Sequence, residues 1–554
     1  MTEKTFQNYQ TWLKLAKDEF VKTELQKMAG NETEIENAFY KDIEFGTGGL
    51  RGVVGAGTNC LNVYTIKKIT QGIANSMKEK GQKSVVITFD SRHFSKEFTF
   101  CSAEVFATNG IKVYLSKECL PTPFLSFAVR TLKTDIGVNI TASHNPAKYN
   151  GYKVYNSDGC QFTDNGSLEL LEYMQKVDPF KVETTDFETL VKKGKIEFIS
   201  EELITKYIER VKKESLTKIE GVKVCYTPLN GASHKIVPRL LTELGVKDLF
   251  IVKEQGYPDG NFTTCPFPNP EKKEALKLGL DLLKETDSDI LVANDPDSDR
   301  LGVAVKHNGK AVLLTGNELG VLFANYILKV RKEQNTLPKT PVIVKTIVTT
   351  KMVEPIAKKY GAKVVSVLTG FKYICSVIKD LEIDGKEEDC IFCFEESYGY
   401  LKGTYVRDKD GVVGGMLAVE MCSYYKKQGK TLVDAVNDLY FEYGYFENKL
   451  FSYEFLGATG AEKLKGLLNN LRESNIEKIG EEKVVKRLDY LGGLNGLPPS
   501  NVLVYEGEEG TEVVIRPSGT EPIVKIYLTV SKTKLENQNK IESIKKWLDK
   551  IFAN

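Results

Sequence analysis

The chain has 554 residues, of which 41% are hydrophobic and 27% are charged, as in ordinary soluble globular proteins. At about 150 residues per domain, this length predicts roughly three to four domains. The 76 Lys and Arg residues balance 75 Asp and Glu residues, giving a formal net charge of +1. This balance gives no support to a nucleic-acid or membrane-surface role.

The N-terminus, Met1-Thr2-Glu3-Lys4, is charged, and no run approaches the roughly 18 apolar residues of a membrane span. The ten cysteines show no disulfide-like spacing, which suits a reducing compartment, so we expect a cytoplasmic protein. Cys390 and Cys393 lie inside an apolar run, and no second Cys or His pair lies near them to complete a zinc site. This context favours a buried strand over a redox or zinc motif.

Residues 3–40 carry apolar side chains at helical spacing, which predicts one or two amphipathic helices. The glycine-dense stretch Phe45–Gly52 would let a backbone approach a ligand beside the fixed cation of Arg51. It lacks the Gly-Lys-Ser/Thr of a P-loop and the G-x-G-x-x-G of a dinucleotide site. A plain tight turn is the alternative.

An α/β pattern follows. Val85–Phe89 has the character of a buried strand, and a helical pattern over about 96–109 and a strand at Ile111–Leu115 complete a β-α-β unit. The polar stretch Asp90–Ser95 stands at the end of the first strand. After another helix, Asp135–Ile140 is the next strand, so we expect a parallel sheet with helices on its faces, ending near residue 200.

The stretch Thr141-Ala-Ser-His-Asn-Pro146 breaks the strand at 135–140 with small polar residues and a proline. Ser143 should therefore lie just past the carboxyl end of a strand, where ligands bind in open α/β sheets. A serine hydroxyl there could be a nucleophile or a phosphate carrier if a nearby group activates it. An ordinary turn with Ser and Asn as helix caps is the alternative.

The rest of the chain contains further α/β units and a different C-terminal pattern. Expected strands lie at 222–226, 248–252, 289–293, 301–305, 341–346, 363–367 and 390–394, and expected helices at about 203–213, 232–244, 271–284, 316–332 and 411–427. From about residue 446, short strands and helices are mixed, including a strand at Ile523–Thr529, which is consistent with an α+β domain.

Asp295, Asp297 and Asp299 occupy alternate positions in a tight loop after the strand at 289–293. Two like charges roughly 4 Å apart repel by about 4 kcal/mol at an effective dielectric constant near 20, so converging carboxylates require a cation. Hard oxygen ligands favour Mg²⁺ or Ca²⁺. The spacing excludes an EF-hand, because Arg300 and Lys306 stand where Gly and Glu are needed. Splayed, solvated aspartates are the alternative.

Two turns suggest ligand contacts. Arg516-Pro-Ser-Gly-Thr520 offers a guanidinium fork, two hydroxyls and turn amides, a plausible phosphate cradle, although a simple β-turn is equally consistent. Glu395 and Ser397, beside a glycine, could bind the hydroxyls of a polyol or form a solvated turn.

Taken together, these motifs resemble the α-D-phosphohexomutase family. The matching pieces are Thr141–Pro146 with Tyr149–Lys153, Asp295–Arg300, Glu395–Gly399 and Arg516–Thr520, in an order and spacing that fit almost the whole chain. Phe45–Gly52, Arg407–Gly411 and the length most resemble the phosphoglucomutase branch, which also includes phosphopentomutase-like members.

The resemblance implies an α/β fold: three related mixed α/β sandwich domains and a smaller C-terminal α+β domain around a central cleft. We place the domains at residues 1–202, 203–312, 313–445 and 446–554. Each domain then carries one functional loop: in chain order, the serine loop, the metal loop, the sugar-binding loop and the phosphate-binding loop.

The resemblance also implies a phosphoserine at Ser143 and Mg²⁺ held by Asp295, Asp297, Asp299 and a serine-phosphate oxygen. Glucose 1-phosphate would become glucose 6-phosphate through glucose 1,6-bisphosphate, which is both intermediate and activator. Phosphoryl transfer is chiefly positioning and charge neutralisation, and the phosphate adds about −1.5 to −2 charge that the metal offsets.

Residue roles follow from the same resemblance. Lys153 and Arg51 are candidates for general acid/base catalysis beside Ser143, with His144 and Arg300 in support. The implied substrate contacts are Arg300, Thr369, Glu395, Ser397 and Lys409 near the sugar, and Arg516, Ser518, Gly519 and Thr520 on the non-transferred phosphate. Phe394 stands where relatives often have Gly, which predicts an altered shape of the sugar-binding turn.

Other functions stay open. A phosphopentomutase, a phosphomannomutase or a glucose 1,6-bisphosphate synthase would use the same site. A silent sugar-phosphate-binding protein would require loss of Ser143, an aspartate ligand or Arg516, all of which are present. A serine hydrolase is disfavoured because no G-x-S-x-G elbow surrounds Ser143. We expect small sugar phosphates as partners, and neither nucleic acid nor a membrane.

Overall fold

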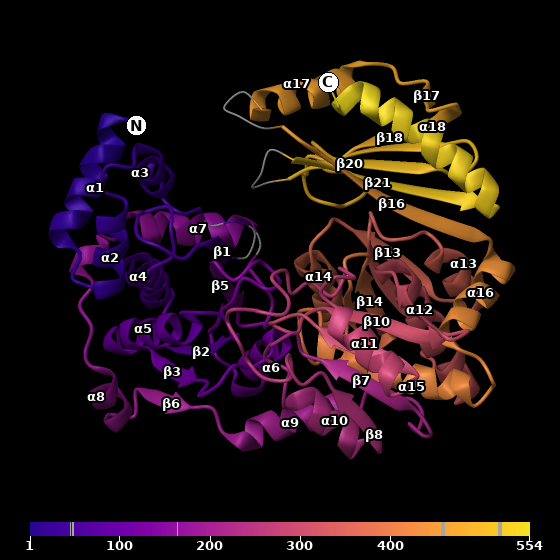
Figure 1. Cartoon of the computed structure of the whole chain (residues 1–554), viewed down its shortest axis with the longest axis horizontal. Helices are drawn as coiled ribbons and strands as arrows, with labels where there is room; N and C mark the ends of the chain where they lie inside the picture. The colour runs from indigo at the N-terminus through magenta and orange to yellow at the C-terminus, as the bar shows by residue number, and fades with distance from the viewer. Residues whose placement is uncertain (45, 47–48, 163, 456–459, 519–522, 554) are drawn as a thin grey trace. The chain divides into compact units, whose positions relative to one another are not determined.

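The computed structural model describes residues 1–44, 46, 49–162, 164–455, 460–518 and 523–553 (Figure 1). The chain forms two compact units, each discontinuous in sequence. The first comprises Met1–Leu314, Ile378–Glu388 and Tyr398–Gly429, and the second comprises Thr315–Val377, Asp389–Ser397 and Lys430–Asn554. The four domain boundaries expected from the sequence remain a prediction.

The N-terminal segment forms the helices α1 (Glu3–Leu15), α2 (Glu19–Lys27) and α3 (Glu32–Phe39). The prediction of one or two helices is wrong, because Asp18 and Asn31 each cap a new helix by accepting a hydrogen bond from a backbone N–H. Trp12 and Phe39 pack edge to face, with ring centroids 5.7 Å apart, in the core that these helices share.

The first sheet of the first unit is mixed. Its strands are β1 (Gly49–Val53), β2 (Ser84–Phe89), β3 (Lys112–Leu115), β4 (Ile136–Ile140), β5 (Tyr149–Asn156) and β6 (Ile196–Phe198), in the order β1-β5-β4-β2-β3-β6. β5 pairs antiparallel with both β4 and β1, whereas the other pairs are parallel. The expected all-parallel sheet is therefore wrong at this edge. Asn150 and Gly151, both poor strand formers, lie within β5.

Helices cover both faces of this sheet. They are α4 (Val63–Glu79), α5 (Ser95–Thr108), α6 (Thr122–Leu132), α7 (Asp164–Gln175), the 3₁₀ turn η1 (Pro179–Lys181) and α8 (Phe187–Lys192). Side chains of α4 and α5 share a core with Val85, Ile87 and Val138 on one face. On the other face, α6 approaches so closely that Gly137 leaves no room for a Cβ atom beside Val129. The expected strands and helix of the β-α-β unit are confirmed.

The second sheet contains β7 (Lys223–Thr227), β8 (Asp248–Ile251), β9 (Ile290–Asn294), β10 (Leu301–His307) and β11 (Lys310–Leu314), in the order β11-β10-β9-β7-β8. β10 runs antiparallel to β9, so the loop 295–300 joins neighbouring strands. The remaining elements of this unit are α9 (Glu201–Lys212), α10 (Ile236–Glu243), α11 (Lys277–Glu285), β15 (Gly399–Leu401) and α15 (Gly411–Lys426). α15 is almost wholly buried and packs on β9 and β10.

The second unit begins with a parallel arrangement of β12 (Val342–Thr346), β13 (Lys363–Val367) and β14 (Cys390–Glu395), in the order β13-β12-β14. Helices along this part of the chain are α12 (Gly316–Glu333), α13 (Val353–Lys359), α14 (Phe371–Ile383), the 3₁₀ turn η2 (Glu387–Asp389) and α16 (Leu432–Tyr443). Cys390 and Cys393 lie buried in β14, with their sulfur atoms 3.4 Å apart, which confirms the predicted buried strand.

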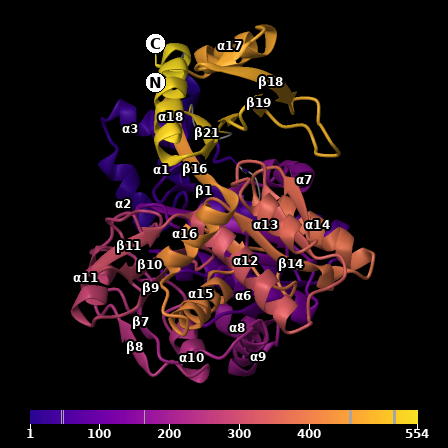
Figure 2. The same ribbon diagram turned by 90° about the vertical axis from the view of Figure 1, so that its right-hand side faces the viewer.

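The C-terminal part is an antiparallel sheet of β16 (Tyr445–Glu454), β17 (Lys478–Ile479), β18 (Glu482–Asp489), β19 (Leu503–Gly507), β20 (Glu512–Pro517) and β21 (Ile523–Lys532), in the order β16-β21-β20-β19-β18-β17. α17 (Gly460–Glu473) and α18 (Lys534–Phe552) lie on one face of it in Figures 1 and 2. The predicted α+β character is confirmed. Among the described residues, no helix combines the length and apolar character needed to cross a membrane.

Candidate active site

Ser143 lies in the loop that follows β4, as the sequence predicts. Its side chain is buried, and its backbone adopts the left-handed conformation with φ of 54°. A non-glycine residue in this conformation is strained by about 1–3 kcal/mol, so the surrounding structure must hold it. The Ser143 backbone N–H donates to Thr141 Oγ at 2.8 Å, and its hydroxyl donates to Asp295 Oδ2 at 2.8 Å.

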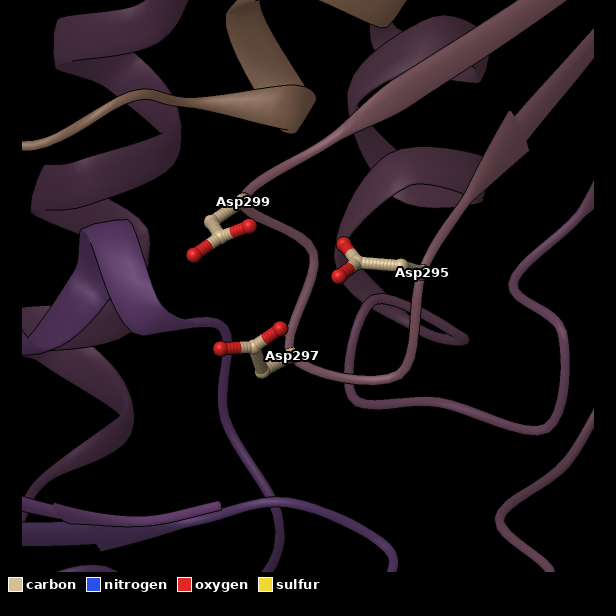
Figure 3. A group of neighbouring side chains, drawn as sticks. All are labelled: Asp295, Asp297 and Asp299. Atoms are coloured by element: carbon tan, nitrogen blue, oxygen red, sulfur yellow. The ribbon is translucent and has the colours of Figure 1, made fainter. Parts of the chain in front are cut away.

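Asp295, Asp297 and Asp299 lie on the loop between β9 and β10, and their carboxyl groups face a common space (Figure 3). One oxygen atom from each carboxylate lies within 4.8 Å of the others. The Arg300 backbone N–H donates to Asp295 Oδ1 at 2.9 Å. Thr122, which sequence reasoning missed, donates its hydroxyl to Asp297 Oδ2 at 2.7 Å.

The three carboxylates fit a divalent cation with hard oxygen ligands. Asp297 Oδ1 and Asp299 Oδ1 are buried and have no hydrogen-bond partner among the described residues. Buried carboxylate oxygens are normally hydrogen-bonded or bound to metal, so these two atoms are the available ligand atoms. This chemistry suits Mg²⁺, which prefers carboxylate oxygens. The predicted convergence of the three aspartates is confirmed.

The electrostatics of the three carboxylates differ. Burial and the neighbouring Asp297 and Asp299 charges raise the pKa of Asp295 well above its ordinary value. Burial also acts to raise the pKa of Asp297, but the Lys153 charge, together with hydrogen bonds from Asp295, Lys153 and Thr122, lowers it below its ordinary value. The pKa of Asp299 is lowered as well, because Lys409 and Lys153 offset burial and the Asp297 charge.

Two lysines from distant parts of the chain meet at this cluster. Lys153 on β5 lies with its Nζ 2.7 Å from Asp297 Oδ2 and 3.2 Å from Asp299 Oδ2. Lys409 Nζ lies 3.0 Å from the same Asp299 oxygen. Burial acts to lower the pKa of Lys153, but the two aspartates raise it above its ordinary value.

Arg51, His144 and Arg300 surround the serine loop. Arg51 on β1 donates from Nη1 to Asn145 Oδ1 at 3.3 Å. His144 Nδ1 lies 3.1 Å from Ser143 Oγ, and burial followed by the nearby Arg300 and Arg51 charges lowers the pKa of His144 well below its ordinary value. Arg300 Nη1 forms an ion pair with Glu271 at 2.8 Å. Phe45, Thr47 and Gly48 of the predicted glycine stretch lie outside the described residues, whereas Gly49–Gly52 belong to β1.

The loop that carries Lys409 is fixed on both sides. Tyr155 donates its hydroxyl to Asp408 Oδ2 at 2.7 Å, and Asp408 Oδ1 lies 3.1 Å from Lys409 Nζ. Asp410 caps α15 and accepts hydrogen bonds from the hydroxyls of Tyr207 and Tyr405 at 2.9 and 2.6 Å. The loop is therefore held by hydroxyl groups within the first unit.

Of the residues predicted to contact the sugar, Thr369, Glu395 and Ser397 lie in the second unit, whereas Arg300 and Lys409 lie in the first. Glu395 ends β14 and accepts a hydrogen bond from the backbone N–H of Gly370 at 3.1 Å, so Thr369 and Glu395 lie on contacting loops. Ser397 follows on the same turn. The Phe394 side chain is fully buried against Gly320 and Phe392 rather than at the turn, so the structure gives no reason for the expected change in turn shape.

The predicted phosphate-binding residues lie at the end of β20. The β20–β21 register places Arg516 opposite Lys525, and neither makes an ion pair with a carboxylate among the described residues. Like charges directly opposite in a sheet are unfavourable unless an anion joins them. Lys525, which lies opposite Arg516 in the strand register, is not among the residues singled out from the sequence. Ser518 follows β20, whereas Gly519 and Thr520 lie outside the described residues.

This fold and site define a class of enzyme. Models of the phosphoglucomutase/phosphomannomutase α/β/α domains I, II and III match residues 42–180, 205–309 and 315–443. A Staphylococcus saprophyticus protein is 35% identical over 536 residues, which cover 94% of this chain and 96% of that protein. The chain therefore belongs to the α-D-phosphohexomutase superfamily and is a phosphohexomutase. The Staphylococcus relative is named phosphoglucomutase.

Solved structures share the fold. A phosphoglucomutase/phosphomannomutase family protein from Burkholderia thailandensis superimposes with a TM-score of 0.70 at 20% identity, over 92% of this chain and 97% of that chain. Parafusin from Paramecium, a protein named as a phosphoglucomutase, gives a TM-score of 0.70 at 18% identity, over 92% of this chain and 94% of that chain. The predicted fold class, of three mixed α/β sandwich domains and a C-terminal α+β domain, is confirmed, and the sheet of the C-terminal domain is antiparallel.

Proposed function

We propose that the protein is a phosphoglucomutase that interconverts glucose 1-phosphate and glucose 6-phosphate through a phosphoserine at Ser143. The observation that carries this proposal is the hydrogen bond from the Ser143 hydroxyl to Asp295, one of three buried carboxylates that fit a divalent cation. A relative that matches nearly the whole chain bears the same name, which supports glucose as the sugar.

Asp295, Asp297 and Asp299, with an oxygen of the serine phosphate, would hold Mg²⁺. The ion supplies the positive charge that offsets the phosphoryl group during transfer. Lys153 and Lys409 add fixed positive charge at the rim of the cluster. This arrangement provides charge neutralisation and positioning, which are the main protein contributions to phosphoryl transfer.

Each transfer step forms one P–O bond and breaks another. The sugar O6 bonds to phosphorus while the bond from phosphorus to Ser143 Oγ breaks, which gives glucose 1,6-bisphosphate. The O6 proton must pass to a base, for which Lys153 and Arg51 are the candidates, supported by His144. Lys153 can accept it only if the bound cation takes over the charges of Asp297 and Asp299, because these two carboxylates raise its pKa. After the bisphosphate turns over, Ser143 Oγ takes the phosphoryl group from O1, and glucose 6-phosphate remains.

The sugar and its second phosphate would be held by the second set of residues. We assign Glu395, Ser397 and Thr369 to the sugar hydroxyls, because Glu395 and the 369–370 loop are already in contact. Lys409 and Arg300 would also contact the substrate. The phosphate that is not being transferred would be bound by Arg516, Ser518, Gly519 and Thr520, together with Lys525, which lies opposite Arg516.

Turnover with several sugars tests this proposal. With Mg²⁺ and a trace of glucose 1,6-bisphosphate, we expect glucose 1-phosphate to react faster than mannose 1-phosphate or ribose 1-phosphate, and EDTA to suppress the reaction. Preference for mannose or ribose would make the protein a phosphomannomutase or phosphopentomutase. Release of bisphosphate as the main product would make it a glucose 1,6-bisphosphate synthase, and no reaction would support a silent binding protein.

A matched pair of serine variants tests the nucleophile. Ser143→Ala removes the phosphoryl carrier, so we expect turnover to fall at least about 1,000-fold. Ser116→Ala is the control, because Ser116 is also buried in the first unit and its hydroxyl has no hydrogen-bond partner among the described residues. Its activity should match the wild type. Full activity in Ser143→Ala would refute the assignment.

A further inference from the structure

Arg92 contacts the serine loop through both terminal nitrogen atoms of its guanidinium group. Its Nη1 donates to the backbone carbonyls of Pro146 and Tyr149, each at 3.0 Å. Its Nη2 donates to the carbonyl of Ser143 at 2.5 Å and to that of Asn145. One side chain therefore donates to three carbonyl groups of the loop between β4 and β5 and to that of Tyr149, the first residue of β5.

These carbonyls need a donor because the loop leaves the sheet. Residues 143–148 belong to neither β4 nor β5, and the carbonyl groups of Ser143 and Asn145 accept no backbone hydrogen bond among the described residues. A buried backbone carbonyl without a hydrogen bond costs about 1–3 kcal/mol. The strained backbone of Ser143, with φ of 54°, adds to the cost of this conformation. Arg92 supplies the compensating interactions.

Asp90 fixes Arg92 and the start of the loop together. Its Oδ2 lies 3.2 Å from Arg92 Nε and accepts a hydrogen bond from the Thr141 hydroxyl at 2.5 Å. Thr141 Oγ in turn accepts from the Ser143 backbone N–H at 2.8 Å. The backbone N–H of Ser143 is thus linked to Asp90 through Thr141, and its carbonyl is held by Arg92.

The Phe262 ring packs against the guanidinium group of Arg92. The centre of its ring lies 5.1 Å from Arg92 Cζ, and the ring is fully buried. Because Arg92 is only 3% exposed, water competes little for its donors. A desolvated guanidinium over an aromatic face is stabilised by the cation–π interaction. The contact also limits the positions that the guanidinium plane can occupy.

We infer that Arg92 is a positioning residue that sets the place and direction of the Ser143 hydroxyl for phosphoryl transfer. This inference rests on the proposed function and goes beyond it, because Arg92 acts through the loop backbone. A buried ion pair with Asp90 that only stabilises the fold is the competing explanation. The two explanations differ in whether catalysis depends on the planar shape of the Arg92 guanidinium group or only on its positive charge.

Replacing Arg92 with lysine distinguishes these two explanations. Arg92→Lys keeps the positive charge near Asp90, but a single ammonium cannot span the four carbonyls that the planar fork reaches. A displacement of about 1 Å at a reacting group can cost on the order of 100-fold in rate. We therefore expect kcat of Arg92→Lys to fall about 100-fold with KM for the sugar phosphate nearly unchanged.

The control is Arg210→Lys. Arg210 also lies over an aromatic ring in the first unit, with Cζ 4.8 Å from the centre of Tyr405, and pairs with a glutamate. Among the described residues its side chain makes no hydrogen bond or ion pair with the serine loop, so kcat should stay within about twofold of the wild type. In Arg92→Ala, guanidinium at low, non-denaturing concentration should restore part of kcat, which a purely structural role would not allow. Wild-type kcat in Arg92→Lys would overturn the inference.

Hydrogen exchange tests the positioning role without turnover. The amides of Ser143, Asn145 and Tyr149 are bonded within the loop, to Thr141 Oγ, Ala142 O and Pro146 O respectively. We expect peptides covering 141–149 to exchange at least about tenfold faster in Arg92→Lys, with the rest of the unit and Arg210→Lys unchanged. Unchanged exchange there would overturn the inference. If the wild type turns over no sugar phosphate, the proposed function fails, and this exchange result alone decides on Arg92.

Discussion

At the residue scale, Asp297 shows how the cluster prepares a ligand atom. Its Oδ2 accepts hydrogen bonds from Thr122 and Lys153, both at 2.7 Å. Its Oδ1 is buried without a hydrogen-bond partner among the described residues. Two donors therefore orient the carboxylate on one side, and the other oxygen remains available to a cation.

Asp297→Asn should weaken Mg²⁺ binding strongly. The change keeps the side-chain volume and the hydrogen bond with Thr122 but removes the negative charge. Residues that only hydrogen-bond to a metal ligand already contribute about 10–100-fold to metal affinity. For a residue that binds the metal itself, we therefore expect the Mg²⁺ affinity to fall at least about 100-fold. Isothermal titration calorimetry with MgCl₂ measures it. Asp281→Asn is the control, because Asp281 is exposed and pairs only with Lys277. Equal Mg²⁺ affinity in all three proteins would contradict the metal site.

The residue types of the site could be predicted from sequence, but several partners could not. Asp295, Asp297 and Asp299 alternate within one short loop, so the sequence alone indicates that their carboxylates converge. The meeting of Lys153 and Lys409 at Asp299 depends on contacts between distant segments. Thr122 has no local signal beyond a helix start.

At the element scale, β5 depends on a close approach of three backbones. A Cβ atom on Gly151 would lie 2.3 Å from the Thr141 carbonyl oxygen and 2.7 Å from that of Leu50. Both neighbours are backbone atoms and cannot move alone. This explains why a residue with poor strand propensity lies in the strand that carries Lys153.

Gly151→Ala should therefore destabilise the first unit by about 1–3 kcal/mol through overpacking. Urea unfolding followed by fluorescence of the buried Trp12 measures the change. Gly55→Ala is the control, since its Cβ would meet only Cys60 Sγ at 3.8 Å, and its stability should change by no more than about 0.5 kcal/mol. If Gly151→Ala were as stable as the wild type, this packing account would be wrong.

Gly320 and Phe394 provide a second element-scale test, between α12 and β14. A Cβ atom on Gly320 would lie 2.3 Å from Phe394 Cδ2, within the core of the second unit. Gly320→Ala should destabilise the wild type by about 1–3 kcal/mol but have little effect in a Phe394→Ala background, where the space is open. A double-mutant cycle measured by urea unfolding reports this coupling. Additive effects would show that Phe394 lies elsewhere.

Most core strands could be predicted because runs such as Val85–Phe89 are apolar and bounded by turns. β1 and β5 could not, because each contains glycine and pairs through long-range contacts. The prediction of a single parallel sheet failed for this reason. The N-terminal helix count failed because Asp18 and Asn31 act as caps inside a continuous helical pattern.

At the scale of the whole molecule, the site residues are divided between the units. The serine, the three aspartates and both lysines belong to the first, whereas Glu395 and Arg516 belong to the second. Periodicity could not predict that residues 398–429 belong to the first unit. Their place in the first unit depends on tertiary contacts, such as the hydrogen bond from the Tyr207 hydroxyl to Asp410 Oδ2 at 2.9 Å.

This division predicts a local effect of Mg²⁺ on stability. A cation present at about 100 times its dissociation constant stabilises the folded state by about 2.7 kcal/mol. The chain has two tryptophans, Trp12 in the first unit and Trp547 in the second. In Trp547→Phe, the unfolding midpoint reported by Trp12 should rise with MgCl₂ and fall with EDTA. In Trp12→Phe, the midpoint reported by Trp547 should change less. The reverse pattern would place the ion in the second unit.

The central claim is that Ser143 carries the phosphoryl group. The most direct measurement is mass spectrometry of the peptide containing Ser143 after incubation with glucose 1,6-bisphosphate and MgCl₂. We predict one added phosphoryl group, which glucose 1-phosphate then removes as bisphosphate is formed, and no such change in Ser143→Ala. Glucose phosphomutase turnover with Ser143 unmodified throughout would contradict the account.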